Sequence, residues 1–106
     1  MDFNYQKDGD ILYGVETFKF KYQEINAADI TILNLLDDKQ YAFEIRMTNE
    51  NVPSDYKFIT SADYAVDNEK FKPLDVEFKF VYNDKQEALQ NAINIISAVM
   101  IKLVKK

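Results

Sequence analysis

The side chains that most often carry out acid–base and nucleophilic chemistry are missing from this sequence, which has no histidine and no cysteine. Catalysis would have to rest on Asp, Glu, Lys, Tyr, Ser or Thr. The one pair of adjacent acids, Asp37-Asp38, is typical of a solvated turn rather than of a metal or catalytic site. The two glycines are isolated and form no phosphate-binding loop. We therefore expect no enzymatic activity and no cofactor, and we assign no catalytic, cofactor-binding or metal-binding residue.

A run of acidic residues is the first candidate for a binding surface. Between positions 50 and 69 there are five acids and one base, and the acids are Glu50, Asp55, Asp63, Asp67 and Glu69. Such a surface could dock on a basic protein, because complementary charge speeds association. The alternative is a surface that only maintains solubility, since a net charge of −5 is modest for a small domain.

The tyrosines are a second candidate, because aromatic rings can line a ligand cavity or a contact surface. The seven are Tyr5, Tyr13, Tyr22, Tyr41, Tyr56, Tyr64 and Tyr82. Most of them alternate in phase with Phe and Ile. This pattern favours packing in the core or at its edge, as expected for aromatic residues in strands.

Charge and length limit the partners further. The negative net charge argues against nucleic acid or an anionic membrane, both of which attract Lys and Arg. All 18 acids precede position 88, whereas positions 88–106 contain three lysines and no acid. The first ten residues contain three Asp and no apolar run, unlike a secretory signal, so we expect a cytoplasmic location. The apolar stretch at 93–104 is shorter than the roughly 20 residues of a membrane-spanning helix.

Period-two alternation of apolar and polar residues predicts most of the fold. An Asp8-Gly9 turn would open a β-hairpin whose return strand continues to Tyr22. The segment 28–36 fits a strand or a short helix, and we favour a strand because a turn at 37–40 and a clear strand at 41–47 follow it. Two further strands are expected at 56–66 and 74–82, the second with the clearest alternation of all. The prediction is an α+β domain, an antiparallel β-meander of about five to six strands.

One C-terminal helix, at about 84–105, is expected to pack on this sheet. Asn83 or Asp84 can cap its start, and lysines near its end suit the helix dipole. A helical wheel groups eight apolar residues into the stripe that would cover the sheet: Leu89, Ala92, Ile93, Ile96, Val99, Met100, Leu103 and Val104. Ile95 and Ile101 fall outside this stripe, so we expect them to be exposed and to contribute to a partner contact. The whole chain, 1–106, is then a single domain with a strand-rich part at 1–82.

These observations favour a small acidic protein-binding module, such as an inhibitor, immunity or accessory factor of a bacterial or phage system. Its partner would be another protein, possibly with a basic surface, and the contact would need no cofactor. One alternative is a homo-oligomeric assembly or chaperone-like protein that associates through its helix and sheet edge. Another is a binder of a small apolar ligand held between helix and sheet.

Overall fold

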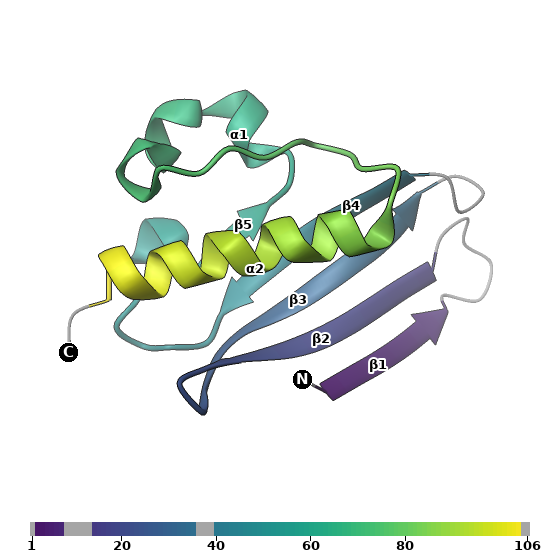
Figure 1. The fold of residues 1–106 in the computed structure, drawn as a ribbon, viewed down its shortest axis with the longest axis horizontal. Coiled ribbons are helices and arrows are strands. Elements are labelled where there is room, and N and C mark those ends of the chain that lie inside the picture. Colours follow the sequence, from purple (N-terminus) through teal and green to yellow (C-terminus); the bar gives the residue numbers. More distant parts are fainter. Residues whose placement is uncertain (1, 8–13, 36–39, 105–106) are drawn as a thin grey trace.

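The computed structural model describes residues 2–7, 14–35 and 40–104. Along the chain its elements are β1 (Asp2–Lys7), β2 (Gly14–Tyr22), β3 (Ile25–Leu35), β4 (Gln40–Met47), η1 (Ser54–Tyr56), β5 (Phe58–Thr60), α1 (Asp63–Val66), η2 (Asn68–Leu74) and α2 (Lys85–Lys102), where η marks a 3-10 helix (Figure 1). The α+β class and the C-terminal helix are therefore confirmed.

The strands form one antiparallel sheet in the order β1-β2-β3-β4-β5, so each strand lies next to its neighbour in the sequence. Four of the strands have six residues or more, and β5 has three. The prediction of five to six strands is therefore more than the structure shows, because only four of its strands are longer than three residues. The predicted turn at Asp8-Gly9 lies outside the described residues, as do residues 37–39 of the turn predicted at 37–40, whose last residue, Gln40, begins β4.

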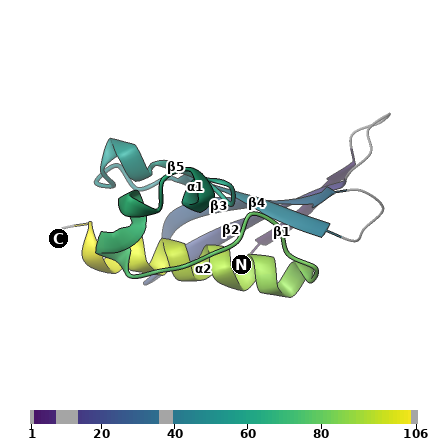
Figure 2. The same cartoon turned by 90° about the horizontal axis from the view of Figure 1, so that it is seen from above.

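Residues 28–35 of the ambiguous segment 28–36 belong to a strand, β3, which pairs with β2 on one side and β4 on the other, and residue 36 lies outside the described residues. A row of opposed residues crosses the sheet, Phe18, Ile30, Ile45 and Ile59, and all four are buried. This row faces α2, which lies against one face of the sheet (Figure 2). Alternation therefore identified the apolar face of the central strands.

The turn between β2 and β3 consists of Gln23 and Glu24, because Tyr22 pairs with Ile25. Both residues have left-handed backbone angles, with φ of 52° and 67°. A two-residue hairpin turn of this kind favours Asn-Gly, since other residues bring Cβ too close to the backbone. The turn is therefore strained.

The prediction of a long strand at 56–66 is wrong, because only Phe58–Thr60 pairs with β4. Side chains take over the backbone hydrogen bonds at the end of β5. Asp63 Oδ2 accepts from the Thr60 N–H at 2.8 Å, and Ser61 Oγ accepts from the Phe43 N–H at 3.2 Å. Such local bonds compete with a continued strand ladder, and the chain turns into α1 instead.

The strand predicted at 74–82 is also wrong. Pro73 lies within η2, and Asp75 ends that helix in the left-handed conformation with φ of 56°. The following residues are extended but pair with the sheet only at Tyr82, which bridges to Tyr41. Phe78 and Tyr82 are buried while Phe80 is exposed. Alternation thus matched the burial of Phe78 and Tyr82 but failed at Phe80, and an alternating pattern does not require a paired strand.

The helix α2 begins where it was expected, with Asp84 accepting a hydrogen bond from the Gln86 N–H at 3.1 Å. The placement of Ile95 on an exposed face is wrong, because this side chain is 1% exposed, whereas Ile101 is 64% exposed. The buried face is wider than the predicted stripe, since α2 packs against η2 as well as against the sheet. Lys102 Nζ, for example, donates to the Leu74 carbonyl at 2.9 Å.

Candidate protein-binding site

Residues 61–82, here called the arm, lie beside α2 and carry the most distinctive surface of the molecule (Figure 1). Three aromatic rings hold the arm together: Phe71 and Phe78 meet edge to face at 4.9 Å, and Tyr64 lies 5.1 Å from Phe78. Phe78 also lies 5.9 Å from Phe43 of β4. Because Phe71 and Phe78 are buried, these contacts fix the irregular arm to the sheet.

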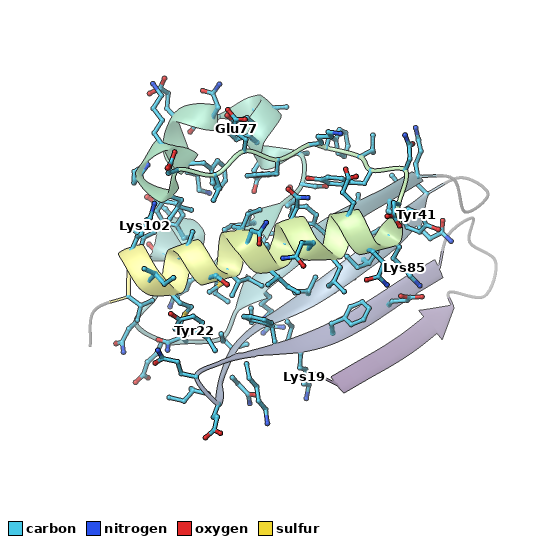
Figure 3. The ribbon with its side chains drawn as sticks, viewed as in Figure 1. Lys19, Tyr22, Tyr41, Glu77, Lys85 and Lys102 are labelled. Carbon is cyan, nitrogen blue, oxygen red and sulfur yellow. The ribbon has the colours of Figure 1, made fainter. Side chains whose placement is uncertain are left out.

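Two adjoining hollows lie on the arm and share Tyr64 and Glu77 as lining residues. The first, of about 520 Å³, is lined by Tyr64, Asn68, Phe71, Lys72, Asp75, Val76 and Glu77. The second, of about 430 Å³, is lined by Tyr64, Glu77, Phe78, Lys79, Tyr82, Glu87 and Asn91, so it extends onto α2. We call the two together the Tyr64 groove. Glu77 lies on the arm above α2 in Figure 3.

The charges of the Tyr64 groove are not balanced. Lys72 Nζ lies 2.8 Å from Glu69 Oε1, and Lys79 Nζ lies 3.6 Å from Glu87 Oε1, so both lysines have acidic partners. Asp75 and Glu77 form no ion pair with any residue that the structure describes. Two carboxylates therefore remain available to a cation from outside.

Two of the predicted acids lie next to the groove, around Tyr56. Burial raises the pKa of the Tyr56 hydroxyl, and the negative charges of Asp55 and Asp67 raise it further. Tyr56 Oη donates to the Lys70 carbonyl at 2.6 Å, and Lys70 Nζ lies 5.5 Å from the Tyr56 ring centre. Asp55 and Asp67 are thus both near enough to Tyr56 for their charges to act on its hydroxyl.

Two of the other predicted acids are engaged within the chain, and the third lies at another hollow. Asp63 is committed to the Thr60 N–H, and Glu69 is paired with Lys72. Glu50 follows β4, between Asn49 and Asn51, which line a separate hollow with Met100 of α2. Asp63 and Glu69 thus already have partners in the chain, and Glu50 lies away from the Tyr64 groove.

Sequence reasoning did not single out Asp75, Glu77 and Glu87, which line the Tyr64 groove. Asp75 and Glu77 alternate with apolar residues in the segment 74–82, for which the sequence predicts a strand. The useful signal was Pro73 shortly before them, because a proline so close to a supposed strand also fits a helix end and an irregular segment.

Two further polar features contribute to the fold rather than to a site. Lys85, the first residue of α2, extends to β2 and pairs with Glu16 at 2.8 Å (Figure 3). Ser61 is buried and bonded to β4. No cluster of three or more His, Cys, Asp or Glu side chains suited to a metal ion occurs within residues 2–7, 14–35 and 40–104. In the same ranges, no helix has the length and apolar character needed to cross a membrane.

Comparison with known proteins adds no family. The chain matches no family model, and neither a curated protein nor a solved structure matches it.

Proposed function

We propose that this protein is a small acidic protein-binding module that captures a basic segment of another protein in the Tyr64 groove. The observation that carries this proposal is the pair of carboxylates, Asp75 and Glu77, that line the groove without an ion-pair partner in the described chain. A partner's Lys or Arg would supply the missing charge.

The groove suits a long cationic side chain. The half-buried Tyr64 ring is held by Phe71 and Phe78, so it offers an aromatic surface of fixed orientation. A cation above such a ring is attracted by its π face, and a neighbouring carboxylate adds to that attraction. Val76 and Phe71 provide apolar contacts for the aliphatic part of a Lys or Arg side chain. Affinity in protein interfaces usually depends on a few such anchoring contacts.

More distant charge would contribute to the rate of capture. Asp55 and Asp67 lie near Tyr56, whose ring contacts Phe71 of the arm, and the chain has a net charge of −5. A field of this sign steers a basic surface toward the groove. An inhibitor, immunity or accessory factor of a bacterial or phage system acts by such surface complementarity. In this proposal the protein is cytoplasmic, uses no cofactor and binds neither nucleic acid nor membranes.

The test begins with a pull-down to identify the partner, followed by measurement of association and dissociation rates. Asp75→Asn combined with Glu77→Gln should weaken binding by about tenfold or more, with a smaller difference at high salt. Glu24→Gln combined with Glu50→Gln is the matched control, because it removes the same charge from exposed positions outside the groove. The proposal fails if the two double variants bind alike, or if only the control loses affinity.

A further inference from the structure

One lysine of the protein already lies in the Tyr64 groove. Lys79 lines the second hollow, and its Nζ lies 3.6 Å from Glu87 Oε1 and 5.9 Å from the centre of the Tyr82 ring. Glu87 and Tyr82 line the same hollow. The ammonium group therefore has an acidic partner and an aromatic face there, which are the two kinds of contact proposed for a partner's cation.

Lys72, the lysine that lines the first hollow, is held differently. Its Nζ lies 2.8 Å from Glu69 Oε1, which is within hydrogen-bond distance, and Glu69 lines neither hollow. Lys72 is thus paired outside the groove, whereas Lys79 is paired with one of the carboxylates that line it.

The contact between Lys79 and Glu87 is easily exchanged for another. Its N···O distance of 3.6 Å is longer than a hydrogen bond, and the two side chains are 71% and 48% exposed. Ion pairs this exposed contribute little stability. The backbone of Lys79 is fixed, because its N–H donates to Tyr82 Oη at 2.8 Å. The lysine side chain can therefore leave the hollow while the arm stays in place.

The second hollow offers more hydrogen-bond acceptors than one ammonium group uses. Glu77 lines it from the arm, above α2 in Figure 3, and forms no ion pair with any described residue. Asn91 lines it from α2. The Asn91 side-chain N–H donates to the Glu87 carbonyl at 2.9 Å, so Oδ1 is the end that is left to accept. Acceptors from two elements thus line one hollow of about 430 Å³.

We infer that the anchoring side chain of the partner is an arginine, and that it displaces Lys79 from the second hollow. This inference rests on the proposed function and specifies its ligand. A partner's lysine would repeat the contacts that Lys79 already makes, so its entry gains little. A guanidinium group can bond to the Glu87 carboxylate through two parallel N–H groups and still donate to Glu77 or Asn91. Lys79 thus lowers the affinity for every incoming cation, and arginine gains enough contacts to offset that loss.

The test uses small probes, so it does not depend on identifying the partner. The Nα-acetyl methylamides of arginine and lysine are titrated into isotope-labelled protein at about 0.3 M salt, which screens long-range charge effects. The NMR shift of the Asn91 side-chain amide gives each dissociation constant. The arginine probe should bind about tenfold more tightly than the lysine probe, because an additional hydrogen bond between charged groups contributes that much.

Removing the competitor should strengthen the binding of both probes. Lys79→Gln is expected to lower both dissociation constants by about two- to fivefold, as for the loss of an exposed ion pair. Lys57→Gln is the matched control, because it removes the same charge from an exposed position outside the groove, and it should change neither constant. Thermal melts would confirm that each variant is folded.

A double-variant cycle tests whether the competition occurs at Glu87. Glu87→Gln should weaken binding of the arginine probe several-fold and remove the gain from Lys79→Gln, because Lys79 then has no carboxylate to hold it in the hollow. Equal affinity for the two probes overturns the inference, as does an absence of binding at about 50 mM probe. A Lys79→Gln variant that binds no better than Lys57→Gln also overturns it. Failure of the proposed function is a separate result, because it is decided by how the partner responds to the loss of the two unpaired groove carboxylates.

Discussion

Tyr41 and Tyr82 exchange both of their backbone hydrogen bonds, at N···O distances of 2.7 Å and 2.8 Å, and thereby tie the end of the arm to β4. The Tyr82 side chain strengthens this connection, because its hydroxyl oxygen accepts from the Lys79 N–H at 2.8 Å and its ring stacks on Phe43 at 6.0 Å. The bridge is the last point at which the arm meets the sheet before α2 begins.

Tyr82→Phe removes only the acceptor of the Lys79 N–H, so we expect it to lower the free energy of unfolding by about 1 kcal/mol. Urea unfolding followed by circular dichroism measures the change. Tyr64→Phe is the control, because no hydrogen bond of the Tyr64 hydroxyl is seen in the described residues, and it should change stability by less than about 0.5 kcal/mol. Equal stability of the wild type and Tyr82→Phe would show that the bond contributes nothing.

The strained turn between β2 and β3 predicts a stabilising substitution. Glu24 has a φ of 67°, which glycine adopts without a steric penalty. Glu24→Gly should therefore raise the free energy of unfolding by up to about 1 kcal/mol, and adding Gln23→Asn should increase the gain. Glu24→Ala loses the same charge but keeps Cβ, so it should give no such gain. A melting temperature of Glu24→Gly at or below that of Glu24→Ala would contradict this interpretation.

Ile95 and Ile101 are a natural pair for testing the orientation of α2. Ile95 is fully buried, so Ile95→Ala should cost about 2–5 kcal/mol of stability. Ile101 is exposed, so Ile101→Ala should stay within about 0.5 kcal/mol of the wild type. Denaturant unfolding of the two single variants gives the comparison directly. Similar losses for both would mean that the helix is rotated from the position described.

Alkaline pH should destabilise the protein through Tyr56 and Tyr82. Burial is the main cause that raises both hydroxyl pKa values above the ordinary value of 10, with Glu87 adding to the effect at Tyr82. The folded state holds these protons more tightly than the unfolded state, so the stabilisation is present below pH 10 and is lost as pH rises through the folded pKa. The free energy of unfolding, measured by urea titration between about pH 8 and pH 11, should therefore fall.

The same series with Tyr56→Phe separates this effect from general alkaline unfolding. This variant lacks one of the two shifted groups, so its stability should fall less steeply above pH 10. Parallel pH curves for wild type and variant would exclude Tyr56 as a contributor.

Patterns in the sequence predicted the elements that depend mainly on local signals. β4 and the start of α2 at Asp84 could be predicted, because strand alternation and helix capping are local signals. The arm could not be predicted this way. Whether residues 75–82 join the sheet depends on where Pro73 and the left-handed Asp75 direct the chain, and on side-chain bonds such as Asp63 to the Thr60 N–H. These contacts join separate elements, so they produce no periodic pattern in the sequence.

The Tyr64 groove could not be predicted for the same reason, although the acidic character of the region beside it could. The acidic character of the region after β4 is visible in the sequence, and the charges of Asp55 and Asp67 both act on Tyr56. The groove itself is built from Tyr64, Glu77 and Glu87, which come from a helix, an extended segment and α2. The exposure of Ile95 was misjudged because a helical wheel assumes a single covered face, whereas α2 is covered on two sides.

The order of the elements has a consequence for synthesis on the ribosome. All five strands precede α2, and the buried row from Phe18 to Ile59 is covered by this last helix (Figure 1). While residues 85–102 are still inside the exit tunnel, the nascent chain exposes the apolar face of its sheet and cannot complete its core. This domain can therefore complete its core only after residues 85–102 have left the tunnel, and until then the apolar face of the sheet stays exposed.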